Sequence, residues 1–252
     1  MPAANYNATV LANGAAGENV MLLTARWDET TPAPACGQFY MLRAWKAEEA
    51  PLLSRPISVH RFDREKKEIS FLYEVRGTGT QKLAALRPGD TVALTGPSGR
   101  GFPVDGTLGG AVALVGGGIG VPPMYSLAKR LLAAGKTPAV ILGFNTASEI
   151  FYKEEFEALG IETILATADG SVGSKGFVTD ALPEAFDTFC ACGPMPMLRA
   201  LCARTKKPGF LSLEARMGCG FGACMGCTIE TAHGPKRVCK EGPVFRKEEL
   251  IW

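Results

Sequence analysis

Four of the eight cysteines lie close together near the C-terminus, and their spacing is the strongest chemical signal in the sequence. The set reads C-x4-C-x2-C-x11-C and consists of Cys219, Cys224, Cys227 and Cys239. This spacing is typical of plant-type 2Fe–2S clusters, which four thiolates hold. Glycines among the first three cysteines allow tight bending around a small cluster and direct N–H groups toward its sulfurs. The four cysteines are therefore predicted metal ligands.

Two other interpretations of these cysteines remain open, a structural zinc on four thiolates and unliganded thiols. Zinc sites usually pair two C-x2-C knuckles, whereas Cys239 stands alone. The other cysteines show no ligand spacing. Of these, Cys190 and Cys202 are predicted core residues, because a free cysteine behaves as a small buried hydrophobe.

A glycine-rich loop, residues 116–120, follows the apolar run Ala111–Val115 and precedes a helical pattern that starts near Pro122. Such a strand-to-helix turn exposes backbone N–H groups and suits a pyrophosphate. The loop is not a complete G-x-G-x-x-G, because the residue three after Gly118 is Val121. A tight turn without a ligand is the alternative.

Two weaker motifs lie earlier in the chain. Arg55-Pro56-Ile57-Ser58 begins a predicted strand, and its arginine and serine could bind a phosphate and a ring nitrogen. A solvated arginine on an edge strand is the alternative. The run 77–80, Gly-Thr-Gly-Thr, opens a predicted helix and is a second candidate phosphate-binding turn.

Three segments with different periodicities must position these residues. Residues 5–103 alternate short β-rich runs with turns, which predicts a small antiparallel barrel. Residues 109–208 alternate strand and helix patterns, which predicts a doubly wound α/β domain. Residues 210–252 are too short to be held by apolar burial alone, so a metal or cluster would stabilise them. We expect three domains, 1–104, 105–209 and 210–252.

The patterns also predict individual elements. In the first segment the expected strands are Val20–Trp27, Gln38–Trp45, Pro56–Phe62, Glu68–Val75 and Asp90–Leu94, with a helical stretch near Thr80–Leu86. In the second, the expected strands are Ala111–Val115, Ala139–Phe144, Thr163–Thr167 and Thr188–Cys192. The expected helices are Pro122–Ala134, Ser148–Leu159, Phe177–Ala181 and Met195–Arg204.

Composition excludes several classes of protein. The 252 residues are 46% hydrophobic, and 27 Lys+Arg balance 25 Asp+Glu, so nothing marks a nucleic-acid binder. Neither a membrane span nor an export signal is visible, and we expect a cytoplasmic protein. The only histidines are His60 and His233, too few for a histidine-based metal site or triad. No acid–base catalytic residues are predicted.

Taken together and in order, these motifs resemble the ferredoxin–NADP+ reductase-like flavoproteins over residues 8–205. The C-terminal segment is similar to the electron-transfer subunits of NAD-linked bacterial dihydroorotate dehydrogenases. The matching runs are Arg55–Ser58, Gly77–Thr80, Gly116–Pro123, Thr167–Gly173, Cys192–Met197, Glu214–Cys227 and Lys236–Phe245.

The resemblance implies an FAD-binding barrel and a nicotinamide-nucleotide-binding α/β domain. For FAD it implies that Arg55 and Ser58 contact the phosphate and the isoalloxazine ring, and that Pro56 and Ile57 line the site. It also implies contacts, largely through the backbone, from Leu72, Tyr73 and Glu74. Gly79 and Thr80 would contact the pyrophosphate. For the nucleotide it implies Gly117, Gly118 and Gly120, with Cys192 and Gly193 near the nicotinamide ring.

The resemblance also implies a role in pyrimidine (UMP) biosynthesis. FAD would convert between the two-electron chemistry of NAD and the one-electron chemistry of the cluster. The partner would be an FMN-containing catalytic subunit that oxidises dihydroorotate, in a heterotetramer with two copies of each subunit. It would face an exposed cluster edge near Met217–Met225. An NADH–ferredoxin oxidoreductase or a sulfhydrogenase-type flavoprotein subunit is the alternative. Residues 145–149 contain no Lys or Arg for a 2′-phosphate, which favours NAD over NADP.

Overall fold

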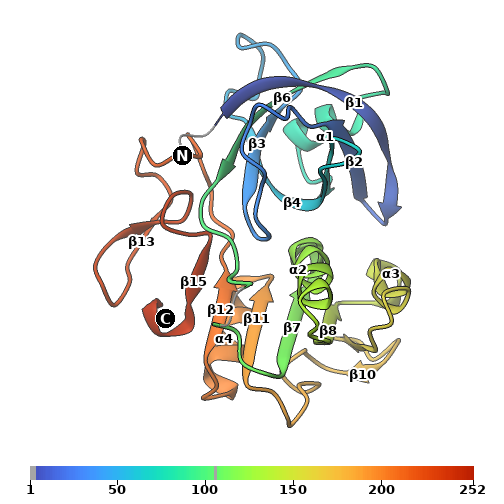
Figure 1. Ribbon diagram of the computed structural model, residues 1–252, viewed down its shortest axis with the longest axis vertical. Helices are drawn as coiled ribbons and strands as arrows, with labels where there is room; N and C mark the ends of the chain where they lie inside the picture. Colours follow the sequence, from blue (N-terminus) through green and yellow to red (C-terminus); the bar gives the residue numbers. More distant parts are fainter. Residues whose placement is uncertain (1–3, 105–106) are drawn as a thin grey trace.

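The N-terminal part of the chain forms a closed antiparallel barrel (Figure 1). The computed structural model describes residues 4–104 and 107–252. Within the first range the strand order is β1-β2-β5-β4-β3-β6. Side chains alternate between core and solvent, as in β6, where Val92 and Leu94 are buried. The elements are β1 (Ala4–Gly17), β2 (Val20–Arg26), β3 (Phe39–Arg43), β4 (Arg55–Asp63), β5 (Glu68–Glu74), α1 (Thr78–Ala84) and β6 (Thr91–Ser98).

Strand β1 is absent from the sequence-based expectations, yet it closes the barrel by pairing with both β2 and β6. Its sequence is rich in Ala, Asn and Gly, and few of its side chains reach the core. Such a strand has little apolar alternation to reveal it. The other five barrel strands and the helix α1 confirm the predicted elements.

The second sheet has the order β10-β9-β8-β7-β11-β12-β15. Its neighbours pair in parallel except at β12 and β15, which are antiparallel. The central strands are apolar and buried, as parallel strands covered on both faces must be. The strands are β7 (Val112–Gly117), β8 (Ala139–Phe144), β9 (Thr163–Thr167), β10 (Ser174–Lys175), β11 (Thr188–Cys192), β12 (Gly209–Ser212) and β15 (Val244–Arg246).

One predicted helix of this domain is shorter than expected, and another is absent. The stretch 148–159 holds only a 3-10 turn and a five-residue helix, because Tyr152 between them has a φ of +66°, which a right-handed helix excludes. Residues 177–181 form a turn, in which the Asp180 carboxylate accepts the Phe177 N–H. The observed helices are η1 (Gly118–Gly120), α2 (Val121–Ala133), η2 (Ala147–Glu149), α3 (Lys153–Glu157) and α4 (Met195–Arg204).

The C-terminal segment is joined to the second sheet. Its strands β12 and β15 complete that sheet, and a small hairpin of β13 (Thr228–Ile229) and β14 (Lys236–Arg237) lies beside it (Figure 1). A last turn, η3 (Lys247–Glu249), precedes the C-terminus. The division into 1–104, 105–209 and 210–252 stays a prediction; residue 105 lies outside the described residues. No helix of the described ranges is both long and apolar enough to span a membrane.

Candidate functional site

A cavity of about 250 Å³ lies where the barrel meets the second sheet. Strands β4 and β5 are neighbours in the barrel and bring their predicted flavin residues to one wall. Cys192, at the end of β11, lines the cavity from the second sheet. The predicted residues that line the cavity are Pro56, Ile57, Ser58, Leu72, Tyr73, Glu74 and Cys192. The structure thus brings together seven residues that the sequence analysis named for FAD and nicotinamide.

The rest of the lining was named from the sequence only as parts of motifs and was not assigned to the flavin site. It includes Ile119 and Pro122 around the start of α2, and Glu214 and Met217 on the segment that leaves β12. One signal could have assigned residues 213–217 to this site. Ligands of open α/β sheets bind beyond the carboxyl ends of the strands, and residues 213–217 directly follow β12.

Arg55, Gly79 and Thr80 form the predicted phosphate-binding end. The Arg55 guanidinium lies over Gly79, where an added Cβ would come within 2.5 Å of Nε. Its Nη1 donates to the Leu53 carbonyl at 2.6 Å, and its Cζ lies 5.8 Å from the Trp45 ring centroid. A charged guanidinium beside bare backbone suits an anionic phosphate. This part of the site therefore fits FAD.

Thr80 also shapes this end of the site. Its hydroxyl accepts the Arg76 and Gly77 N–H groups at 3.0 and 3.1 Å. These bonds fix the chain where β5 gives way to α1, so Thr80 holds the shape of the turn.

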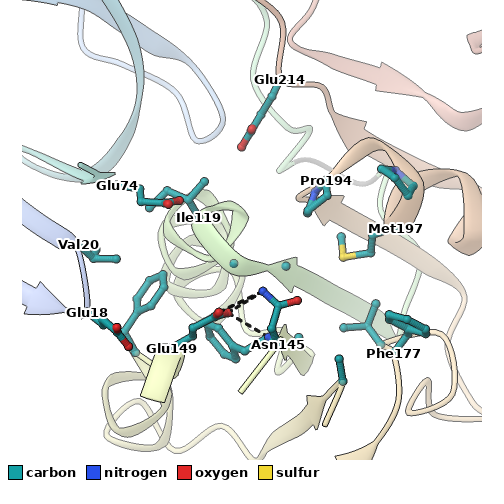
Figure 2. A pocket seen from close by; sticks show the side chains of 18 of the residues that line it. Glu18, Val20, Glu74, Ile119, Asn145, Glu149, Phe177, Pro194, Met197 and Glu214 are labelled. Atoms are coloured by element: carbon teal, nitrogen blue, oxygen red, sulfur yellow. Dashed lines mark hydrogen bonds between the residues drawn. The ribbon is translucent and has the colours of Figure 1, made fainter. Parts of the chain in front are cut away.

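A larger cavity of about 810 Å³ adjoins the first one and is shown in Figure 2. Gly117 and Gly118 line it, as predicted for the nucleotide, and Gly118 has a φ of +49°, which favours glycine. The shared wall of the two cavities consists of Glu74, Arg76, Ile119 and Glu214.

Gly120 and Gly193 are not among the residues that line either cavity. A Cβ on Gly120 would lie 2.1 Å from the Cys192 carbonyl oxygen. One on Gly193 would lie 3.1 Å from the Gly117 nitrogen. Both glycines therefore let the loops after β7 and β11 approach each other. Their predicted contact with the nucleotide stays a prediction.

The charged side chains of the larger cavity are mostly acidic, which the sequence analysis missed. They are Glu18, Glu74, Glu149 and Glu214, against a single Arg76 that pairs with Glu74 at 2.7 Å. Glu149 is held by the backbone and side-chain amides of Asn145, at 3.0 and 2.9 Å from its Oε2 (Figure 2). Glu214 faces the open cavity, and desolvation by the surrounding walls raises the pKa of its carboxyl.

The four predicted ligand cysteines lie in two pairs. The backbone N–H groups of Ala223 and Cys224 donate to Cys219 Sγ at 3.2 and 3.4 Å, and that of Cys239 donates to Cys227 Sγ at 3.4 Å. Burial opposes ionisation of Cys219, but N–H bonds from Cys224 and its neighbours prevail and lower its pKa to about 6. Burial and the adjacent Cys227 raise the pKa of Cys239 to about 12.

This paired arrangement suits a two-iron cluster, in which each iron can take two thiolates. Among the described residues, no group of three or more His, Cys, Asp or Glu has the geometry for a single metal ion. The ligand role of the four cysteines stays a prediction. One face of residues 219–227, here named the cluster loop, is open to solvent, since Phe221 and Met225 are each more than half exposed.

Of the cysteines outside the loop, Cys190 is fully buried, as expected of a core residue, and Cys202 is partly exposed.

Comparison with known proteins gives consistent results. A family model described as the iron–sulfur cluster binding domain of dihydroorotate dehydrogenase B matches residues 214–251, and one for an oxidoreductase NAD-binding domain matches 114–203. The dihydroorotate dehydrogenase B (NAD(+)) electron transfer subunit of Geobacillus sp. (strain WCH70) is 44% identical, over 96% of this chain and 97% of the relative. Its counterpart from Bacillus cereus (strain AH187) is 47% identical, over 85% and 86%.

Solved structures agree on the fold. The structure of an NADH-dependent reduced ferredoxin-NADP oxidoreductase superposes with a TM-score of 0.86 at 28% identity, covering 97% of this chain and 90% of that one. A ferredoxin NADP+ reductase from Neisseria gonorrhoeae superposes with a TM-score of 0.67 at 16% identity, covering 79% and 89%. The second likeness concerns the fold alone.

Proposed function

This chain belongs to the family of dihydroorotate dehydrogenase B (NAD(+)) electron transfer subunits, and we propose a route by which electrons cross it. Membership confirms the resemblance, the fold class and the cofactors expected from the sequence: an iron–sulfur cluster, NAD and an FAD-binding, reductase-like fold. In the proposed route, electrons from dihydroorotate oxidation enter at the cluster, pass FAD and leave on NAD+, in pyrimidine biosynthesis.

The shared wall of the two cavities is the observation that carries this proposal. Glu74, Ile119 and Glu214 each border both cavities, so a flavin and a nicotinamide would meet there. Met217 also lines the smaller cavity, two residues before Cys219. A flavin in the smaller cavity would therefore lie close both to the nucleotide and to the cluster.

The residues of this chain would bind and orient the cofactors. Arg55 would neutralise the FAD phosphates, and Ser58 would offer its hydroxyl to the isoalloxazine ring. The backbone of Gly117 and Gly118 would approach the nucleotide. Bound FAD would accept electrons singly from the cluster and pass them on as a pair, which is the chemistry required between the cluster and NAD+. Since the cofactors supply this chemistry, the chain needs no acid–base pair.

The proposal extends to the assembly. The partner would be an FMN-containing catalytic subunit, in a heterotetramer with two copies of each chain, facing the exposed residues Phe221 and Met225 of the cluster loop. Residues 1–104, 105–209 and 210–252 would serve FAD, NAD and the cluster respectively.

The test is to co-express this chain with the dihydroorotate dehydrogenase encoded in the same genome. We expect a stable complex with FAD, about two irons and two acid-labile sulfides per chain, that reduces NAD+ with dihydroorotate. Zinc without labile sulfide, or a chain that purifies without the partner, would contradict the proposal.

The likeness to the NADH-dependent reduced ferredoxin-NADP oxidoreductase, which spans nearly the whole chain, favours a ferredoxin-linked enzyme as the second candidate. A sulfhydrogenase-type subunit shares this fold. Reduction of ferredoxin or polysulfide by NADH, without any activity toward dihydroorotate, would support this second class.

A further inference from the structure

A buried histidine lies in the seam between the barrel and the second sheet. His60 is the extra residue of a bulge in β4, where the pairing with β5 shifts between Val59 and Arg61. Bulges redirect a side chain and recur beside active sites. Here the bulge turns His60 toward α2, and its side chain is fully buried. In Figure 1, α2 lies directly below β4.

One hydrogen bond joins His60 to the first turn of α2. Its Nδ1 lies 3.2 Å from the Pro122 carbonyl oxygen. A carbonyl can only accept, so Nδ1 carries the proton. Burial, helped by Arg61 and Lys129, lowers the pKa of His60 to about 3, so the ring is neutral and Nε2 is a bare acceptor. The Nδ1 hydrogen bond therefore fixes the Nδ1–H tautomer. Nε2 is buried without a partner among the described residues.

Aromatic rings enclose the histidine from the side of the second sheet. The His60 centroid lies 5.3 Å from that of Tyr125 and 4.6 Å from that of Tyr152, and the Arg61 guanidinium lies over both tyrosines. Tyr152 has left-handed backbone, a costly conformation for a tyrosine that its surroundings must hold. Its neighbour Phe151 lines the larger cavity. The seam around His60 is therefore tightly packed, and it lies next to both cavities.

Both ends of the His60 bond lead to cofactor-binding residues. On β4, Pro56, Ile57 and Ser58 line the smaller cavity, and Pro122 lines it from α2. The loop immediately before α2, which contains Gly117 and Gly118, lines the larger cavity. The distance between β4 and α2 would therefore set how far a nicotinamide in the larger cavity lies from a flavin in the smaller one.

We propose that His60 is a positioning residue for electron transfer between the two cofactors. Through Pro122 it holds the first turn of α2, and with it the nucleotide loop, at a fixed distance from β4. This inference rests on the proposed function, because it assumes that FAD and NAD occupy the two cavities.

The test compares His60→Asn, His60→Gln and His60→Leu in the purified complex. The asparagine amide can donate near the position of Nδ1, the glutamine amide lies near that of Nε2, and leucine donates nothing. In stopped-flow measurements, Leu and Gln should slow FAD reduction by NADH about 10- to 100-fold, as a misplacement of about 1 Å does. In these two variants the charge-transfer band between nicotinamide and flavin should weaken, while the affinity for NAD+ should stay within about threefold of the wild type. Asn should restore the rate and the band.

Val59→Ala is the matched control, because Val59 lies next to His60 but packs in the barrel core. It should lower the melting temperature without slowing FAD reduction. Amide exchange at Gly120, Val121 and Met124, around the two prolines of this turn, gives a readout without nucleotide chemistry. It should accelerate in the His60→Leu and His60→Gln variants but not in His60→Asn.

Unchanged FAD reduction and exchange in the Gln variant would overturn the proposal, as would an Asn variant as slow as Leu. If the Leu variant does not fold, the Asn and Gln pair decides. A wild-type complex that NADH does not reduce would instead refute the proposed function, and the exchange measurement would still test His60.

Discussion

The cluster loop and the two cavities are built from the chain in opposite ways. Three of the predicted ligand cysteines lie within residues 219–227, and their own backbone N–H groups bond the sulfurs. The larger cavity, in contrast, takes Glu18 from the first hairpin, Glu149 from the middle of the chain and Glu214 from near its end. The spacing of residues along the chain therefore predicts a local site, whereas it does not predict a site that is assembled from distant segments.

The largest effect is expected from a substitution that disrupts only the cluster loop. Cys227→Ser should remove one thiolate from a buried pair and abolish the cluster, because each iron needs its full ligand set. Electron flow from dihydroorotate to NAD+ should fall more than about 100-fold, while FAD reduction by NADH persists. Labile-sulfide analysis and visible spectra measure the loss of the cluster, and stopped-flow absorbance measures FAD reduction by NADH.

Cys202→Ser is the control for this variant, since Cys202 lies outside the loop and is only partly buried. It should keep the cluster. Loss of FAD together with the cluster in Cys227→Ser would show that the two sites are not separable.

The second prediction breaks the phosphate end of the distant site. In Gly79→Ala the new Cβ would press on the Arg55 guanidinium, at a cost of roughly 1–3 kcal/mol. FAD affinity, measured by fluorescence titration, should fall about 10- to 100-fold with the cluster intact. Gly77→Ala is the matched control, because nothing lies within 4 Å of its added Cβ. Equal losses in both variants would point to the α1 turn rather than to Arg55.

The third prediction concerns pH and the seam between the domains. The pKa of His60 is about 3 in the folded chain, below its value of about 6.5 when unfolded, so its contribution to stability is complete above pH 6.5 and declines as the pH falls toward 3. Between pH 7 and 5 the free energy of unfolding should drop by about 2 kcal/mol from this group. Denaturant titrations of wild type and His60→Asn check it. The same pH slope in both would exclude His60 as the cause.

The smallest expected effect concerns the negative charge of the larger cavity. Glu149 and Glu18 place negative charge where a 2′-phosphate would add more, so the cavity should disfavour NADPH. Glu149→Gln should improve kcat/KM for NADPH several-fold and leave that for NADH within about twofold. Glu157→Gln, an exposed residue paired with Lys153, is the control. An unchanged ratio of NADPH to NADH would place the discrimination elsewhere.

Much of the fold was predictable because strand patterns are local. The runs 163–167 and 188–192 form strands with the predicted bounds, and five predicted barrel strands are present. Strand β1 escaped because its core contacts are few. The expected helix over 148–159 is shortened to Lys153–Glu157, because Tyr152 packs in the seam with a left-handed backbone that interrupts the helical pattern.

The candidate site divides in the same way. The cysteine spacing, the glycine loop and Arg55–Ser58 each carry a signal within a few residues, so the sequence by itself was enough to predict a cluster loop, a nucleotide turn and a flavin strand. Tertiary structure alone decided that β4, α2 and the segment after β12 enclose two adjoining cavities. It also decided that four glutamates face one of them and that His60 joins the two domains. These features arise from burial and from pairing between segments far apart in the chain, and spacing along the sequence does not encode them.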